Sequence, residues 1–143
     1  ENVPFAITLG ARGSEAIRAG GPAACDTAPI TMDGKAVFRF AVETMPRCLQ
    51  TVLDRSQKTL SDLDWVVCHQ ANARIIDLAA KKYHIPPEKY YKNIQKYGNT
   101  SAASIPLVIS ELHDLGKVGP GSRVLVVGFG GGLTWGGALV EFA

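Results

Sequence analysis

The chain has 143 residues, enough to bury the core of one ordinary domain. Its hydrophobic fraction of 46% and charged fraction of 20% are typical of a globular protein, and a net charge of +2 does not indicate general binding to nucleic acid. No apolar run approaches the ~18 residues that would cross a bilayer. Cys25, Cys48 and Cys68 lack Cys-x-x-Cys spacing, which argues against disulfides or zinc and favours the cytoplasm.

The hydrophobic pattern predicts alternating strands and helices. Residues 5–10 read as a strand, and the Gly-rich stretch from 11 to about 33 reads as a long loop. Apolar residues at helical spacing predict a helix over 35–55 that contains Pro46, where we expect a kink. Further strands are expected at 65–68, 90–94, 123–128 and 138–142, and further helices at 72–83 and 101–115.

This β-α-β-α-β-α-β-β order predicts an α/β domain with a mixed five-stranded sheet and helices on both faces. Functional residues of such sheets gather just beyond the carboxyl ends of the strands. Three short runs follow the expected strands: His69 after 65–68, Asn99 after 90–94, and residues 129–132 after 123–128. The pattern therefore predicts an active site where the three runs meet.

Each run also has a purely structural interpretation. A histidine at a strand end is commonly a packing residue, and Gly98-Asn99 is a common turn dipeptide. The three glycines at 130–132 would suit a flexible hairpin connection as well as a close approach to substrate.

None of the three cysteines stands in a convincing setting for a nucleophile. Cys68 precedes His69 on an expected strand, so its side chain should point to the opposite side and be buried. Cys48 lies at the edge of a helical stripe, and Cys25 lacks a strand-turn-helix context.

The three runs, in this order, resemble the carboxyl-terminal half of β-ketoacyl-acyl-carrier-protein synthase III. The runs are His69-Gln70-Ala71-Asn72-Ala73-Arg74-Ile75, Gly98-Asn99-Thr100-Ser101-Ala102-Ala103-Ser104 and Phe129-Gly130-Gly131-Gly132-Leu133-Thr134-Trp135-Gly136. The resemblance covers nearly the whole chain and implies a thiolase fold, in which two similar halves pack together. Residues 1–143 would form the carboxyl-terminal half-domain. The amino-terminal half, which carries the nucleophilic cysteine, would be absent from this chain.

The resemblance implies a catalytic role for each run. His69 and Asn99 would point at one thioester carbonyl, and a neutral imidazole N–H and an amide N–H would stabilise the enolate left when a malonyl thioester loses carbon dioxide. The backbone N–H of Gly131 would be one donor of a second oxyanion hole, which holds the tetrahedral intermediate of acyl transfer.

The resemblance also implies a partner surface. Acyl carrier protein would contact Gln70, Ala71, Asn72, Ala73 and Arg74. Asn72 and Lys35 would contact the pantetheine arm of coenzyme A or carrier protein, although some members of the family carry Asn at the position of Lys35. On the expected helix, Arg74 and Lys81 share one face, which forms either a basic docking patch or an ordinary solvated face.

The expected function is that of a 3-oxoacyl-acyl-carrier-protein synthase III in fatty-acid biosynthesis, which condenses acyl-CoA, in the simplest case acetyl-CoA, with malonyl-acyl carrier protein. The whole enzyme would be a cytoplasmic homodimer, without a metal or cofactor, because the coenzyme A thioester is a substrate. Two alternatives remain. One is a plant-type polyketide synthase, which typically carries Gly-Phe-Gly-Pro-Gly at residues 128–132, where this chain has no Pro. The other is a noncatalytic partner subunit, which the absent nucleophile would explain.

Overall fold

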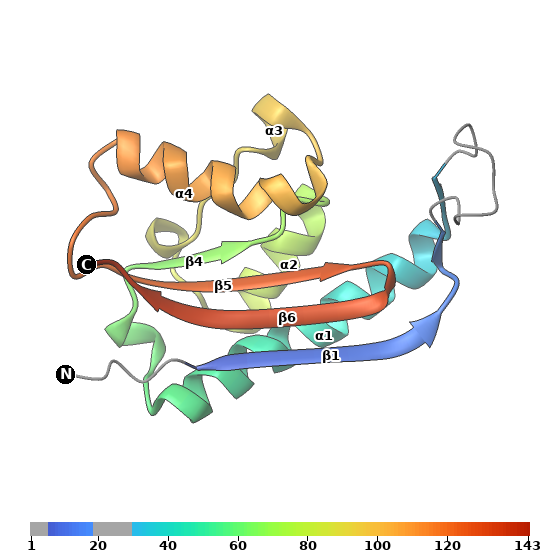
Figure 1. The fold of residues 1–143 in the computed structure, drawn as a ribbon, viewed down its shortest axis with the longest axis horizontal. Coiled ribbons are helices and arrows are strands. Elements are labelled where there is room, and N and C mark those ends of the chain that lie inside the picture. Colours follow the sequence, from blue (N-terminus) through green and yellow to red (C-terminus); the bar gives the residue numbers. More distant parts are fainter. Residues whose placement is uncertain (1–5, 19–29) are drawn as a thin grey trace.

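The computed structural model describes residues 6–18 and 30–143 (Figure 1). Its centre is a four-stranded sheet in the order β1-β6-β5-β4, in which β4 and β5 are parallel and the other pairs are antiparallel. The strands of this sheet are β1 (Ile7–Ser14), β4 (Trp65–Cys68), β5 (Arg123–Gly130) and β6 (Gly132–Glu141). The helices are α1 (Gly34–Ser56), α2 (Ala73–Lys82), α3 (Ile94–Tyr97) and α4 (Ser104–Asp114), with short 3-10 turns at Leu60–Asp62, Pro87–Lys89 and Ser101–Ala103.

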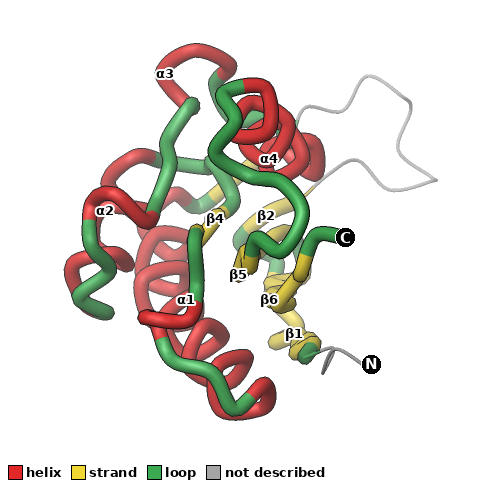
Figure 2. The backbone as a smooth tube through the Cα atoms, turned by 90° about the vertical axis from the view of Figure 1, so that its left-hand side faces the viewer, coloured by secondary structure: helices red, strands yellow, loops and turns green. Residues whose placement is uncertain are grey.

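Helices cover both faces of the sheet, as the sequence predicts (Figures 1 and 2). Alternation along β4 divides the core between them. Val66 and Cys68 point to the face covered by α1 and α2, whereas Val67 points to the face covered by α4 and packs with Val108 and Leu112. The α/β class is therefore confirmed.

The expected fifth strand is wrong for the described residues. Of residues 90–94, only Tyr90 forms a bridge, parallel to Val66, and Ile94 already begins α3. The reason is that the Gln70 side chain, instead of a neighbouring strand, forms hydrogen bonds with the backbone of this segment. The Asn93 N–H donates to the Gln70 side chain at 3.1 Å, so it is not available to a neighbouring strand.

The expected loop over residues 11–33 is also shorter than predicted. β1 continues to Ser14 because the long strand β6 offers it partners along its whole length, down to Gly132. β2 (Ile17–Arg18) then pairs with β3 (Thr31–Met32) in a small second sheet. Residues 19–29, which include Cys25, lie outside the described residues.

The predicted helices are confirmed, and most of their ends lie within one residue of the predicted position. α1 begins after Asp33, whose carboxylate accepts two backbone N–H groups at 3.0 Å, and the helix continues without a break through Pro46. The expected helix over 101–115 is a 3-10 turn followed by α4. Within the described ranges, no helix is both long and apolar enough to cross a membrane.

Two close contacts fix β1 against β6 and α1 against the sheet. Trp135 pairs with Gly10 across β1 and β6, and its indole ring occupies the space where a side chain on Gly10 would lie. At Gly137, an added Cβ would lie 2.8 Å from the Cys48 sulfur, so α1 rests directly on the backbone of β6. These contacts bring the start of α1 beside the turn between β5 and β6, where Val37 and Leu133 share one apolar cluster.

Candidate active site

His69 stands just beyond the carboxyl end of β4, and its backbone N–H continues the ladder by donating to the Val127 carbonyl at 2.8 Å. Its Nδ1 lies 2.6 Å from the hydroxyl of Ser104. Its ring packs edge to face with Phe129, with centroids 5.3 Å apart. Ser104 belongs to the second run and Phe129 to the third, so the structure brings the three runs together at one imidazole, as the sequence predicts.

Burial favours the uncharged form of the His69 imidazole. Burial lowers the pKa of His69 below its ordinary value of 6.5, because the charged form would lose hydration. No charged group among its described contacts offsets this loss, because these contacts are with Ser104, Phe129 and the backbone of Gly128. His69 is therefore suited to donate a hydrogen bond as a neutral group.

Asn99 lies in the segment that leads into α4, and its side chain is exposed. Its Oδ1 accepts the backbone N–H of Ser101 at 3.1 Å, which fixes the orientation of the amide and turns the two N–H groups of Nδ2 away from that bond. A short turn, Ser101–Ala103, connects Asn99 to Ser104, the residue that binds His69. The convergence of the His69 and Asn99 donors on one oxygen atom stays a prediction.

The glycine run forms the hairpin connection between β5 and β6, as the structural interpretation predicts, and the connection is tight. Gly131 alone separates β5 from β6, and its carbonyl accepts the Thr134 hydroxyl at 3.0 Å. Gly132 has φ of +114°, a conformation that other residues rarely adopt. Gly131 is exposed, and a Cβ added to it would lie 3.8 Å from Ile17. Its role as an oxyanion donor stays a prediction.

Gln70 requires a correction, because its side chain is only 1% exposed. The amide donates to the carbonyl of Cys68 at 2.8 Å and accepts the N–H of Asn93 at 3.1 Å. Where the chain leaves the sheet after β4, backbone C=O and N–H groups lack partners in a neighbouring strand. The Gln70 side chain forms hydrogen bonds with them instead. Its side chain therefore cannot contact a carrier protein.

The rest of this run lies nearer the surface. Asn72 is the N-cap of α2 and accepts the N–H of Arg74 at 2.9 Å, so its oxygen has a structural role and its Nδ2 is left for other partners. Ala71 and Ala73 are half-buried, whereas the Arg74 side chain is exposed. Contacts of these residues with a carrier protein or pantetheine stay predictions.

The basic residues proposed for partner binding are also exposed. Lys35 lies in the first turn of α1, where its backbone N–H bonds to the Asp33 carboxylate. Lys81 and Lys82 are exposed in the last turn of α2. None of these positions contradicts the proposed roles, and none of them establishes a ligand.

The described cysteines lie in settings that disfavour the reactive thiolate. Burial raises the pKa of Cys48 to about 11 and the pKa of Cys68 to about 12, so both remain thiols at neutral pH. Cys68 lies on the face of the sheet covered by α1, as its position in the strand predicts. Among the described residues, no group of three or more His, Cys, Asp and Glu side chains could hold a metal ion.

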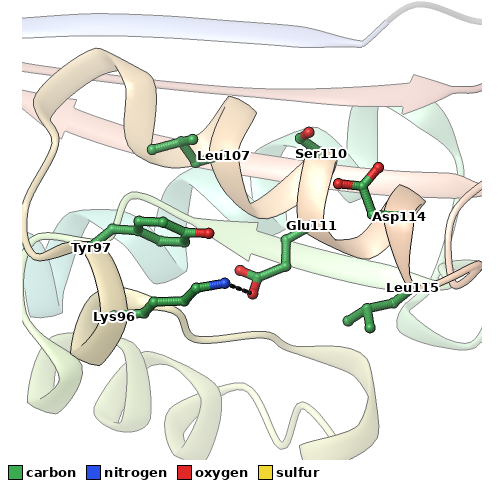
Figure 3. A pocket seen from close by; sticks show the side chains of 7 residues that line it. All are labelled: Lys96, Tyr97, Leu107, Ser110, Glu111, Asp114 and Leu115. Carbon is green, nitrogen blue, oxygen red and sulfur yellow. Dashed lines mark hydrogen bonds and ion pairs between the residues drawn. The ribbon is translucent and has the colours of Figure 1, made fainter.

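A separate cavity of about 290 Å³ lies against α3 and α4 (Figure 3). Lys96 and Glu111 line it and form an ion pair with a nitrogen–oxygen distance of 3.1 Å. Hydrogen bonds from Asn93 and Lys96 lower the pKa of Glu111, so the carboxylate is already satisfied. His69 and Asn99 are not among its lining residues, and the cavity is not part of the site described here.

Sequence reasoning did not assign a role to Ser104, although it is the residue bonded to His69. Thirty-five positions separate the two residues, and no local pattern joins them. The one available signal was the place of Ser104 in the first turn of the helix expected over 101–115, inside the second run.

Comparisons with known proteins place the chain in one family. The sequence profile of the family described as 3-oxoacyl-[acyl-carrier-protein (ACP)] synthase III C terminal matches residues 53–142. The chain is 49% identical over 113 residues to the chloroplastic β-ketoacyl-[acyl-carrier-protein] synthase III of Arabidopsis thaliana, covering 79% of this chain and 28% of that protein.

Solved structures extend the likeness to the whole fold. The β-ketoacyl-[acyl carrier protein] synthase III of Thermus thermophilus superposes with a TM-score of 0.90 at 36% identity, over 100% of this chain and 47% of that chain. A priming β-ketosynthase from the R1128 polyketide biosynthetic pathway superposes with a TM-score of 0.87 at 30% identity, over 97% of this chain and 45% of that chain.

The chain spans about a third of the length of the curated relatives that it matches. The matched profile covers more than half of the chain, and the fold is the thiolase fold of the solved synthases. The chain therefore belongs to the 3-oxoacyl-[acyl-carrier-protein] synthase III family and corresponds to its carboxyl-terminal part.

Proposed function

We propose that this chain is the carboxyl-terminal half-domain of a 3-oxoacyl-acyl-carrier-protein synthase III, an acyltransferase of fatty-acid biosynthesis. Together with an amino-terminal half that carries a nucleophilic cysteine, it would condense acyl-CoA, in the simplest case acetyl-CoA, with malonyl-acyl carrier protein. The observation that carries the proposal is the meeting of all three runs at His69, which contacts Ser104 and Phe129.

The first half-reaction would acylate the cysteine of the amino-terminal half. Its thiolate attacks the carbonyl of acyl-CoA, and the negative charge passes to the carbonyl oxygen. The backbone N–H of Gly131 and that of the cysteine itself would hold this oxyanion. Collapse of the intermediate breaks the bond to the coenzyme A sulfur, and free coenzyme A leaves with a proton. The exposed, tight turn at Gly131 supports this role.

The second half-reaction would make and use an enolate. When the malonyl thioester loses carbon dioxide, the electron pair of the broken carbon–carbon bond moves onto the thioester oxygen. N–H donors of His69 and Asn99 would stabilise that charge. The enolate carbon then attacks the acyl-cysteine, and the cysteine thiolate leaves. The lowered pKa of His69 supports a neutral donor, and the bond from Ser101 to Asn99 supports an amide turned N–H outward.

The carrier protein would dock beside α2. Arg74, Lys81 and Lys82 are exposed on this helix and would attract an acidic partner. Asn72 Nδ2 and Lys35 would bind the pantetheine arm. Ala71 and Ala73 would contribute contact area, whereas Gln70 would act only by holding the chain in place.

The proposal has two further parts. The whole enzyme would be a homodimer, as the family resemblance implies. It would work in the cytoplasm, a reducing compartment in which the buried free thiols of Cys48 and Cys68 stay reduced. No metal or redox cofactor is required by the proposed steps, because coenzyme A enters as part of a substrate.

Mass spectrometry of the protein after incubation with acetyl-CoA tests the proposal. We expect an acetylated cysteine in the polypeptide that supplies the amino-terminal half, and its loss when malonyl-acyl carrier protein is added and 3-oxobutanoyl-acyl carrier protein forms. If no accompanying polypeptide becomes acetylated, the proposal fails and the noncatalytic subunit is favoured.

The likeness to a priming polyketide β-ketosynthase supports a second candidate, a condensing enzyme of a polyketide pathway. The glycine run, which lacks the Pro of plant-type polyketide synthases, favours the first candidate. Competition between malonyl-CoA and malonyl-acyl carrier protein separates the plant-type enzyme from the first candidate. We expect the carrier-linked substrate to be preferred, and a preference for malonyl-CoA would indicate the plant-type enzyme.

A further inference from the structure

Ser104 occupies a position that a merely structural helix residue would not need. It is the first residue of α4, it is 2% exposed, and its hydroxyl faces the imidazole of His69 at 2.6 Å. The same hydroxyl accepts the backbone N–H of Gln70 at 3.3 Å. The buried serine of α1 behaves differently, because Ser56 donates to the Val52 carbonyl of the preceding turn.

The count of donors and acceptors at Ser104 decides the direction of the bond to His69. A hydroxyl has one proton to donate and can accept two hydrogen bonds. The N–H of Gln70 can only donate, so it occupies one acceptor position. If His69 also donated from Nδ1, the Ser104 proton would need a third partner, and the described part of the chain offers none within hydrogen-bond distance. A buried unpaired hydroxyl proton is unfavourable, so Ser104 must donate to Nδ1.

We propose that Ser104 is a positioning residue that fixes His69 as the neutral tautomer with its proton on Nε2. The tautomer follows directly from the bond, because a neutral imidazole that accepts at Nδ1 carries its proton on Nε2. The benefit to catalysis rests on the proposed function, in which His69 must present an N–H donor to the thioester oxygen.

The choice of serine at this position has a chemical consequence. A carboxylate facing Nδ1 would accept a hydrogen bond, place the proton on Nδ1 and leave Nε2 as a proton acceptor, as a general base requires. It would also favour the charged imidazolium. The hydroxyl of Ser104 places the proton on Nε2 and does not favour the imidazolium, so His69 is suited to donate a hydrogen bond from Nε2.

Gln70 gains a clear role in this arrangement. Its buried amide binds the Cys68 carbonyl and the Asn93 N–H, which holds the turn after β4 in one conformation. This turn directs the Gln70 N–H at the Ser104 hydroxyl and keeps one acceptor position occupied. The direction of the Ser104 hydroxyl therefore depends on a rigid backbone group instead of on mobile water.

Nitrogen NMR of ¹⁵N-histidine-labelled protein reads the tautomer directly. The sample is the full chain together with any polypeptide that accompanies it, compared with Ser104→Ala and Ser104→Thr. We expect wild-type His69 to carry its proton on Nε2, Ser104→Ala to show a mixture of both tautomers, and Ser104→Thr to restore the wild-type signals. Ser56→Ala, which removes an equally buried hydroxyl from α1, should leave the His69 signals unchanged.

Kinetics of malonyl thioester decarboxylation provide the second readout. Ser104→Ala should lower kcat about tenfold, the equivalent of one net hydrogen bond, at unchanged KM, and Ser104→Thr should recover it. A wild-type proton on Nδ1, or an Ala variant with unchanged signals, would overturn the inference. If the tautomer behaves as described but malonyl thioesters are not decarboxylated, the positioning role stands and the proposed function fails.

Discussion

His69 and Phe129 pack edge to face, with ring centroids 5.3 Å apart and an angle of 75° between their planes. The contact joins the end of β4 to the end of β5. Phe129 in turn packs against Phe40 of α1, with centroids 6.3 Å apart. The helix that covers the sheet therefore supports the imidazole through one intervening ring, and this ring is part of the apolar shield that keeps His69 uncharged.

Replacing this ring should change the titration of His69. In Phe129→Ala, water reaches the imidazole more easily, so the pKa of His69 should rise toward its ordinary value of 6.5. The free energy of unfolding should fall by about 1–3 kcal/mol. An NMR titration gives the pKa, and Phe142→Ala, which removes a half-buried ring packed with the opposite core cluster, is the control. An unaltered His69 titration in Phe129→Ala would remove Phe129 from the account.

The lowered pKa of His69 also predicts how stability depends on pH. Between the folded pKa and the unfolded value of 6.5, the unfolded chain binds the proton and the native chain does not. The free energy of unfolding should therefore decrease as pH falls below about 6.5. Urea unfolding across this range should show a shallower decrease for His69→Gln than for the wild type. Equal slopes for wild type and His69→Gln would contradict a buried neutral imidazole.

The described cysteines should resist thiol reagents in the folded protein. Burial raises the pKa of Cys48 to about 11 and that of Cys68 to about 12, so the reactive thiolate is scarce and the sulfur is shielded. Peptide mapping after brief treatment with iodoacetamide should find both unmodified, and both should react in denaturant. Rapid labelling of either one in native protein would show that α1 does not lie on the sheet as described.

Gln70 and Arg74 should differ sharply despite being four positions apart. Gln70→Ala leaves the N–H of Asn93 without its partner and should lower the free energy of unfolding by about 1–3 kcal/mol. Arg74→Glu reverses an exposed charge and should raise the KM for malonyl-acyl carrier protein while leaving stability unchanged. Chemical denaturation and steady-state kinetics measure the two effects. The reverse pattern, a KM effect from Gln70 and a stability effect from Arg74, would return Gln70 to the docking surface.

Much of the fold follows from local pattern. Helical spacing of apolar residues located α1 and α2, and short apolar runs located β4 and β5. The strand expected over residues 90–94 failed because a distant side chain, Gln70, captures the backbone N–H that a strand would have used. The extension of β1 was missed for a related reason, because its pairing depends on the length of β6 rather than on its own composition.

The sequence marks candidate site residues but not the groups that support them. His69, Asn99 and the glycine turn are marked by their sequence runs and by their places after expected strands. The hydroxyl of Ser104 and the ring of Phe129 act on His69 across long stretches of sequence, so their roles appear only when the chain is folded. The burial of Gln70 also appears only in the folded chain, since its sequence run predicts an exposed residue that contacts a carrier protein.

The most direct test of the central claim separates decarboxylation from acylation in the assembled synthase. His69→Ala and Asn99→Ala should each slow malonyl decarboxylation by about 10²–10³-fold, the typical cost of one oxyanion donor, because the enolate loses a hydrogen bond. Both variants should still transfer acetyl from acetyl-CoA to the cysteine at near the wild-type rate. Normal decarboxylation together with lost acylation in either variant would contradict the enolate-stabilising pair.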